Sequence, residues 1–465
     1  MRYVFYFFIF CIITISTSKA ENDFRVAPVF FSKYKSNGGD WHFSKQNILI
    51  NGFGLTSSYL NNDLKITSDY IQLFITGNID NDRFLYFSPE QSFPYLRNSL
   101  DTDGYWTENA TMKISYDYTG FKLIIGKYDN NWGPGKRSIH ISNKAPSYPK
   151  FGFRWEINKK MTLDYFHGIL HSGIIDSSKS KYYQHVWENS EYESTIGSRN
   201  ITIDRYIAAH RIEWNVNKKL KLVANESVIY AMRGFDFHYL MALAPFLQIE
   251  DYLGDLDNIQ MGSEISYSFN SNRHAYLCFY MDELTPERIF KKDNHNWFAW
   301  QTGIKFNNLI YIKDQFIIEY NWVDHRVYKH KFEMNNFYSH DQPLGFWAGP
   351  HSQEFFLEYQ IDFRNNTNIL FYFSNTKRGP VTEEIIFNKY NEIYENQRFD
   401  SGYEQKSIVS LNLNKGSNYK KLNFSSGIEI INWKNYMFDK KDPEQQTGTN
   451  VKKLSFNFSI LYNIN

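Results

Sequence analysis

The sequence predicts an all-β protein, a transmembrane antiparallel β-barrel of about 16 to 18 strands with short periplasmic turns and long extracellular loops. Three observations predict this fold. Segments in which apolar and polar residues alternate recur along the chain, short and long connections separate them, and no segment after residue 20 is apolar enough for a membrane-spanning helix. Together they favour a chain that crosses a membrane with strands.

The first twenty residues have the features of a cleaved signal peptide. Arg2 provides a positive start, Val4–Ile15 is mainly apolar, and Ser18-Lys19-Ala20 places small residues before a cut. An uncleaved anchor is the alternative, but so short a run does not reach the roughly 20 residues that a hydrocarbon core requires. We therefore expect a signal peptide at 1–20 and a single barrel unit at 21–465, because no linker divides the remainder.

Cysteine usage and composition exclude several classes of protein. Removal of the signal peptide takes Cys11 and leaves Cys278 alone, so no intramolecular disulfide can form. Aromatic residues make up 18% of the chain, yet the mean hydropathy is −0.53. This combination fits a large soluble β-protein or a transmembrane barrel, in which lipid-facing and lumen-facing residues average to a polar mean. The net charge of +1 argues against nucleic acid as a partner, and outer-membrane lipid is the expected surrounding.

Period-two alternation marks the strands. Leu357–Phe363 and Leu454–Ile460 alternate without a fault, which gives each strand one apolar and one polar face. The same pattern predicts strands at Met112–Tyr118, Lys219–Val223, Glu264–Phe269, His274–Tyr280, Phe316–Trp322, Ile369–Phe373 and Ser410–Leu413.

The connections between these strands are of two kinds. Asparagine tolerates left-handed backbone, so tight turns are expected at 158–160, 215–218, 270–272, 307–308 and 365–366. Long stretches rich in charge, Tyr, Gly and Pro lie at 174–202, 282–298, 324–354, 376–406 and 432–450. This asymmetry is typical of outer-membrane barrels, whereas a soluble sandwich has no reason to sort its connections. A β-propeller is a further alternative, but no repeat of about 40 to 50 residues recurs.

Three motif blocks resemble those of one family. The segments 131–135 (NWGPG) and 142–146 (SNKAP) look like the signature of Wzi-type capsule-assembly proteins. Residues 210–258 follow that family's order of strand, turn, strand and loop, and 342–350 (QPLGFWAGP) resembles its Q-P-L-G-x-x-x-G-P loop. The blocks cover about residues 110–375.

The resemblance implies an outer-membrane barrel that binds exported capsular polysaccharide or exopolysaccharide and retains it at the cell surface, lectin-like and without catalysis. The polysaccharide export machinery is then a further expected partner. A porin passing oligosaccharides or small solutes is the alternative, which an open lumen favours. An enzyme is not expected, because the sequence has no G-x-S-x-G elbow, and His171-Ser172 with Asp176 is too generic a grouping. The best-described members carry an N-terminal helical plug, but residues 21–60 show no clear helical period.

Sugar binding requires flat aromatic side chains for stacking and amide or charged groups for hydrogen bonds. Acidic sugars add a need for cations, because charge-assisted hydrogen bonds are stronger than neutral ones. Three groups of residues offer this chemistry. They are the loop residues Trp132, Arg137, His140 and Asn143; then Glu226, Arg233 and His238; and finally Arg326, His340 and Asp341.

Each group also has a structural explanation. The glycines around Pro134 can simply fold a loop into the lumen, with Trp132 packing it down. Glu226 is expected to face the lumen, where a salt-bridge network would hold the barrel round, and Met241–Leu253 is expected to form a short helix at the barrel mouth, more typical of packing than of a ligand site. The histidines at 325, 330 and 340 lack the spacing of a metal motif, so neither a metal ion nor another cofactor is expected.

Overall fold

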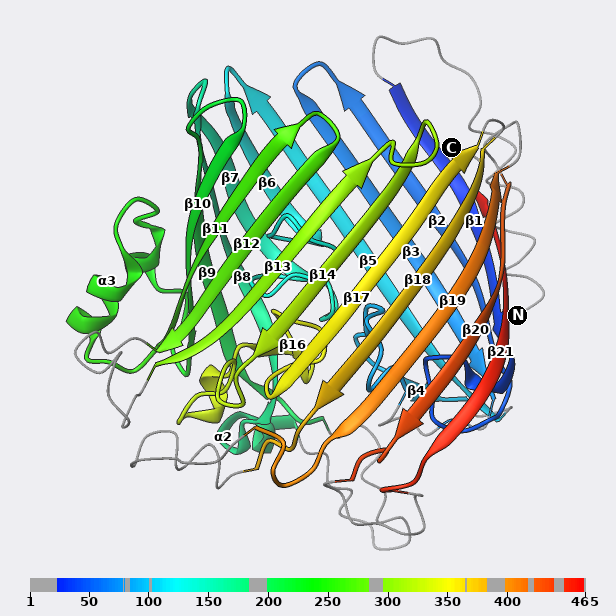
Figure 1. Ribbon diagram of the computed structural model, residues 1–465. Helices are drawn as coiled ribbons and strands as arrows, with labels where there is room; N and C mark the ends of the chain where they lie inside the picture. Colours follow the sequence, from blue (N-terminus) through cyan, green and yellow to red (C-terminus); the bar gives the residue numbers. More distant parts are fainter. Residues whose placement is uncertain are drawn as a thin grey trace, which may run out of the picture.

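Eighteen long antiparallel strands close into a barrel in the computed structural model (Figure 1). The sheet closes because β1 pairs with β21, from Val29 opposite Asn463 to Lys35 opposite Asn457. The strands are β1 (Asp23–Lys35), β2 (Ile48–Asn61), β3 (Leu64–Thr76), β5 (Gly104–Tyr118), β6 (Phe121–Tyr128), β7 (Tyr148–Asn158), β8 (Met161–Ile175), β9 (Thr202–Asn215), β10 (Leu220–Ala231), β11 (Asn258–Asn270), β12 (Arg273–Glu283), β13 (Trp297–Asn307), β14 (Asp314–Val323), β17 (Ser352–Phe363), β18 (Thr367–Arg378), β19 (Glu404–Gly416), β20 (Leu422–Lys434) and β21 (Val451–Asn463).

Smaller elements complete the structure. A two-residue strand, β4 (Arg97–Asn98), pairs with β5, and β15 (Tyr338–Ser339) pairs with β16 (Gln342–Pro343). The α-helices of the described residues are α2 (Ser177–Ser180) and α3 (Phe246–Leu253). The structure describes residues 23–77, 79, 84–99, 103–183, 199–283, 296–363, 366–382, 398–416, 422–438 and 447–463. The expected signal peptide lies outside the described residues.

The predicted alternation is confirmed by the burial of the strands. In β21, Ser455 and Lys453 are buried, whereas the intervening Leu454 and the following Phe456 are exposed. The apolar set faces outward and forms the belt expected against lipid, while the polar set faces the barrel interior. Eight of the nine segments predicted from alternation lie within strands of the barrel, and the ninth, Lys219–Val223, begins one residue before β10.

Connections at the two ends of the barrel differ in length, as predicted. Two- to six-residue turns such as 159–160, 271–272 and 308–313 lie at one end, where β1 begins and β21 ends (Figure 1). The other end carries the long connections, which include 129–147, 232–257 and 324–351. We call these the short-turn end and the long-loop end.

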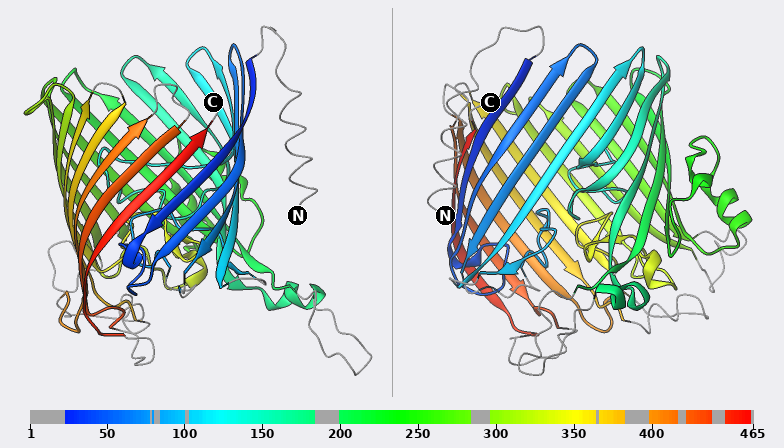
Figure 2. Two further views of the ribbon diagram at one scale, coloured as in Figure 1. Left: turned by 90° about the vertical axis from the view of Figure 1, so that its right-hand side faces the viewer. Right: turned by 180° about the vertical axis from the view of Figure 1, so that it is seen from behind.

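Loops fill part of the lumen. Residues 129–147 and 324–351 fold into the barrel, together with the described part of 84–99 (Figures 1 and 2). Phe87, Trp132, Ile139 and Phe337 from these loops are buried in one apolar cluster, which also includes the lumen-facing wall residues Ile207, Ala209, Ile229 and Cys278. The described loops therefore narrow the lumen by packing against the inner face of the wall.

Residues 232–257, which connect β10 to β11, lie outside the barrel wall (Figures 1 and 2). The helix predicted within Met241–Leu253 forms as α3, but its expected place at the barrel mouth is wrong. Its buried Phe246 and Ile249 pack on Val228 and Tyr230 from the outer face of the wall. Among the described residues, no helix is both long enough and apolar enough to cross a membrane.

Candidate functional site

The lumen loop 129–147 is fastened to the barrel wall by one carboxylate. Glu319, on the inner face of β14, accepts the backbone N–H of Lys136 at 2.5 Å and that of Arg137 at 3.2 Å. The hydroxyl of Tyr276 on β12 donates to the same carboxylate. Glu319 is completely buried, so these donors satisfy a group that would otherwise be costly to remove from water.

The glycines of the NWGPG block allow this close approach. Gly133 has a φ of 138°, a backbone conformation that L side chains rarely adopt. A Cβ on Gly135 would lie 2.7 Å from Glu319 Oε1 and 2.9 Å from Gln301 Nε2. The backbone of the loop can therefore approach Glu319 and Gln301 closely at Gly135, because this residue has no side chain. The same block positions Trp132, which is 5% exposed. The backbone N–H of Trp132 donates to Ile141 O at 2.8 Å, and its ring packs edge-on against Phe166.

Arg137 and Lys136 carry positive charge on the next part of the loop. Arg137 Nε lies 3.4 Å from Glu354 Oε2, and its guanidinium lies 4.5 Å from the ring centre of Phe356. Lys136 Nζ pairs with Glu358 at 2.7 Å, while the Lys136 side chain stays 41% exposed. Lys136 is thus the cation of this loop that solvent can reach most easily.

His140 belongs to the same loop and is a buried, uncharged packing residue. Burial, with a smaller contribution from the nearby Arg211, lowers the pKa of His140 to about 3. The ring sits over Gly262 of β11, where a Cβ would come within 2.4 Å of the His140 Cε1. An imidazole that stays uncharged in this way is a poor ligand for an acidic sugar.

The SNKAP block holds a buried lysine. Lys144 Nζ donates to Leu85 O at 3.1 Å, Glu90 O at 3.1 Å and Ser92 Oγ at 2.8 Å, so it ties the loop to the segment 84–99. Burial lowers the pKa of Lys144 to about 7. Its three acceptors explain how an ammonium group is tolerated there.

The motif blocks that resemble one family meet in space. Ser142 of the SNKAP block donates from its N–H to Leu344 O at 2.7 Å and from its hydroxyl to Gly345 O at 2.5 Å, both in the QPLG loop. The loop 324–351, which contains the QPLG block, also contacts the block 210–258, because Asn258 Nδ2 donates to Asn335 O at 2.8 Å. Segments 77 and 203 residues apart in the sequence are thereby joined.

A hollow of about 190 Å³ opens among the inward-folded loops, and we call it the inner hollow. It combines three cations, three amides, two hydroxyls and one indole, and none of its lining residues, all in the described part of the chain, carries a carboxylate. Two of the predicted binding residues, Arg137 and Asn143, line it, whereas Trp132 and His140 do not. The lining is Pro89, Gln91, Asn131, Lys136, Arg137, Ser138, Ser142, Asn143, Lys144 and Trp347.

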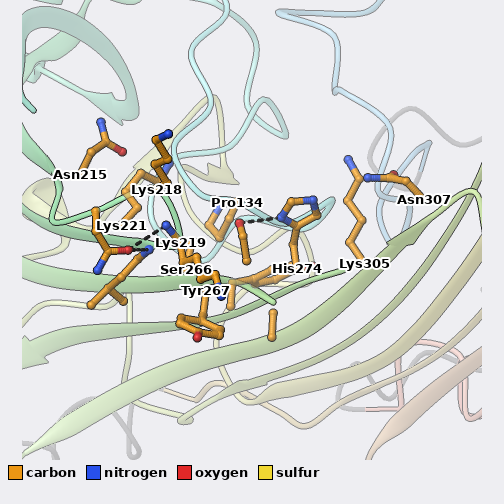
Figure 3. A pocket seen from close by; sticks show the side chains of 15 residues that line it. Pro134, Asn215, Lys218, Lys219, Lys221, Ser266, Tyr267, His274, Lys305 and Asn307 are labelled. Atoms are coloured by element: carbon orange, nitrogen blue, oxygen red, sulfur yellow. Dashed lines mark hydrogen bonds between the residues drawn. The ribbon is translucent and has the colours of Figure 1, made fainter. Parts of the chain in front are cut away.

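A second hollow, of about 460 Å³, reaches the short-turn end, and we call it the basic hollow. In Figure 3, Pro134 lies between Lys219 and Lys221 on one side and His274 and Lys305 on the other. His274 Nδ1 and Ser268 Oγ lie 2.8 Å apart in a hydrogen bond. Because Pro134 lines this hollow and Lys136 lines the inner one, the same short stretch of loop separates the two.

The second predicted group does not belong to the lumen, and the expectation that Glu226 faces the lumen is wrong. Its neighbours at even positions of β10, Val228 and Tyr230, pack against α3 outside the wall, whereas the odd-numbered Ile229 joins the lumen cluster. Glu226 accepts the backbone N–H groups of Phe246 and Leu247 at 2.7 and 3.1 Å, so it caps the first turn of α3.

Arg233 and His238 belong to the same outer segment. Arg233 pairs with Asp236 at 3.0 Å and with Asp257 at 2.6 Å, and this contact with two carboxylates raises the pKa of Arg233. His238 Nδ1 lies 2.7 Å from Asp236. The group therefore fixes the segment 232–257 and is remote from both hollows.

The third predicted group shapes the loop 324–351. His340 and Asp341 have φ values of 50° and 57° and form the tight turn between β15 and β16. The His340 ring stacks on His171 of β8 at 4.5 Å, and burial lowers the pKa of His340 to about 4. Arg326 pairs with Asp324 at 3.0 Å and lies over the Trp297 ring. Within the described residues, no group of three potential metal ligands is gathered here or elsewhere.

Sequence reasoning missed several residues of the site. Glu319 lies on the predicted strand Phe316–Trp322, whereas Glu354 falls at the end of the stretch 324–354 that was expected to be a loop and instead lies on β17. Nothing in the sequence indicates that a distant loop would use their carboxylates. Trp347 lies inside the QPLGFWAGP block, so its position in a motif could have identified it as a residue of the site. Gln91 lies outside every motif block, and no sequence feature identifies it.

Comparison with known proteins connects this architecture to a family. The family described as "Capsule assembly protein Wzi" matches residues 85–447. No curated protein matches the chain in sequence. Among solved structures, Wzi of Escherichia coli, described as an outer-membrane protein involved in group 1 capsule assembly and as a carbohydrate-binding β-barrel, is similar with a TM-score of 0.57 and 11% identity, over 94% of this chain and 83% of that one.

OccAB2 of Acinetobacter baumannii also aligns, with a TM-score of 0.49 and 10% identity, over 95% of this chain and 98% of that one. The likeness to Wzi of Escherichia coli extends to the barrel as a whole, and the family match spans all three motif blocks. The chain is an outer-membrane protein, as its barrel and lipid-facing belt indicate. It belongs to the Wzi family of capsule-assembly proteins.

Proposed function

We propose that this protein binds exported capsular polysaccharide or exopolysaccharide and retains it at the cell surface without catalysing a reaction on it. The observation that carries the proposal is the inner hollow, whose lining offers cations and amides and no carboxylate. Family membership and the carbohydrate binding described for Wzi of Escherichia coli support the same function.

The chemistry of the inner hollow favours an acidic polymer. The Lys136 side chain is partly exposed and can donate a charge-assisted hydrogen bond to a uronate carboxylate. The exposed Asn143 supplies an amide that both donates to and accepts from sugar hydroxyls. Arg137 supports the site indirectly, because Glu354 and Phe356 already hold its guanidinium in place.

The partly filled lumen favours binding over passage of solutes. A porin of this strand number relies on an aqueous interior, whereas here the loops 129–147 and 324–351 pack into one apolar cluster with the wall. We therefore expect low conductance for the protein in a planar bilayer. Large and steady channels would favour the porin alternative instead.

The test measures binding of alginate oligosaccharide, an acidic probe, and of neutral dextran to the purified barrel by calorimetry in detergent. A charge-assisted hydrogen bond contributes about 1.5 to 3 kcal/mol, so we expect Lys136→Ala to weaken alginate binding roughly tenfold or more. Asn143→Ala should weaken both probes. Heat-modifiable migration in gels checks that each variant folds.

Lys305→Ala is the matched control, because Lys305 is a lumenal lysine of the basic hollow. The inner hollow is supported if Lys136→Ala loses affinity and Lys305→Ala keeps it. A larger loss in Lys305→Ala would remove the inner hollow from the proposal, and absence of binding to both probes by the wild-type barrel would contradict glycan binding.

A further inference from the structure

The outer segment 232–257 has an unusually apolar exposed surface. It lies against the outside of the wall near the long-loop end (Figures 1 and 2). Eight of its large apolar side chains are exposed, and several of them make little contact with the rest of the protein. They are Met232, Phe237, Leu240, Met241, Leu243, Leu247, Tyr252 and Leu256, with Phe237 74% and Leu243 65% exposed. A patch of this kind in water is a liability and usually marks an interaction surface.

The opposite side of the segment is firmly packed on the barrel. Tyr239 and Phe246 are completely buried against outward-facing residues of β8 to β11, among them Tyr165 and Tyr230. Tyr165 also donates from its hydroxyl to Tyr239 O at 2.9 Å. The exposed apolar side chains are thus presented from a fixed support.

Several charged groups at the base of the segment are paired within the protein, whereas Gln248 and Asp251 of α3 are exposed. Glu226 caps the first N–H groups of α3 and lies 3.1 Å from His210, so its charge is covered by the helix. Arg233 and the Tyr239 hydroxyl both bond to Asp257. At the end of α3, Gly254 N–H donates to Glu250 O at 3.0 Å. Such pairing is what backbone and charged groups need where water is excluded.

The exposed face continues the lipid-facing belt. Outward residues of the neighbouring strands, Ile169 on β8, Ile265 on β11 and Leu277 on β12, are each about half exposed. In an outer-membrane barrel these residues contact acyl chains. Asp255, by contrast, lies 3.7 Å from Lys331 of the loop 324–351, so the acidic end of the segment is next to the water-facing loops.

We propose that residues 232–257 form a membrane-inserted flap, whose exposed apolar side chains are covered by acyl chains of the outer leaflet. The flap adds lipid contacts beside the barrel wall. It also shields the pair of His210 and Glu226 on the wall from the acyl chains. The proposal is independent of polysaccharide binding, because the flap is outside the barrel and both hollows are within it.

The test places an environment-sensitive fluorophore, NBD, on Leu243→Cys in the full-length barrel. Cys278 is completely buried and stays unlabelled in the folded protein. The protein is reconstituted in phosphatidylcholine vesicles with and without lipid carrying a doxyl quencher on the acyl chain. Ile265→Cys on the lipid-facing belt and Lys160→Cys in a short turn provide the matched controls.

We expect the label at Leu243→Cys to emit at shorter wavelength than at Lys160→Cys and to be quenched at least half as strongly as at Ile265→Cys. Tyr252→Cys, at a position 80% exposed, repeats the measurement if Leu243→Cys fails to fold. Quenching no greater than at Lys160→Cys overturns the proposal. Cysteine cross-linking between two barrels through Leu243→Cys, without quenching by lipid, also overturns it in favour of a self-association surface.

Discussion

Replacement of Glu319 by alanine should release the lumen loop from the wall. The change removes the acceptor used by the Lys136 and Arg137 N–H groups and by the Tyr276 hydroxyl, all at a completely buried position. Each buried donor left without an acceptor costs about 1 to 3 kcal/mol. Because water from the nearby hollows can satisfy some of them, we expect the free energy of unfolding to fall by about 2 to 4 kcal/mol.

The assay combines urea unfolding in detergent with single-channel conductance in a planar bilayer. Glu319→Ala should unfold at lower urea concentration and should conduct severalfold more than the wild type, because the loop no longer narrows the lumen. Glu358→Ala is the control, since its ion pair with the partly exposed Lys136 is worth at most about 1 kcal/mol. Stability and conductance that match this control would refute the role given to Glu319.

Two further predictions concern His140. Gly262→Ala puts a Cβ 2.4 Å from the His140 ring, so we expect about 1 to 3 kcal/mol lower stability in thermal unfolding, whereas Gly234→Ala, which meets open space, should change little. Because burial lowers the pKa of His140 to about 3 in the folded protein, the unfolded chain binds the proton more readily below about 6.5, and stability should fall as pH drops from about 6.5 towards 3. Titration of unfolding in His140→Gln should show a shallower loss; an unchanged slope would contradict this.

The barrel itself could be predicted because its physics is local. A strand such as Leu454–Ile460 alternates because one face meets lipid and the other meets the barrel interior. Consecutive residues therefore alternate between apolar and polar, and this pattern is visible in the sequence. Tight turns likewise depend on a few consecutive residues, as at 158–160, where the Asn158 side chain accepts the N–H of Lys160. The family resemblance added the order of the loops and the expectation that they bind a polysaccharide.

The site could be predicted only in part, because it is built from contacts between distant segments. The glycines of the NWGPG block indicated a loop folded into the lumen, and Gly135 lies against the wall there. What it approaches, Glu319, lies almost two hundred residues away on a strand with several similar polar positions. Trp132 was selected as a sugar platform for its flat ring, but the same ring also fills apolar space, and burial against Phe166 uses it in that way.

The face to which a strand residue points was the harder question, and Glu226 shows why. Alternation assigns polar residues to the lumen only where the outer face meets bare lipid. On β10 both faces are covered by protein, since Ile229 packs against the lumen loops and Val228 lies under α3. A carboxylate can then occupy the outer face, because the N-terminal N–H groups of α3 and the nearby His210 satisfy it. An outward Glu226 therefore requires the flap, and an outer segment that covers it is what the sequence pattern of β10 could not reveal.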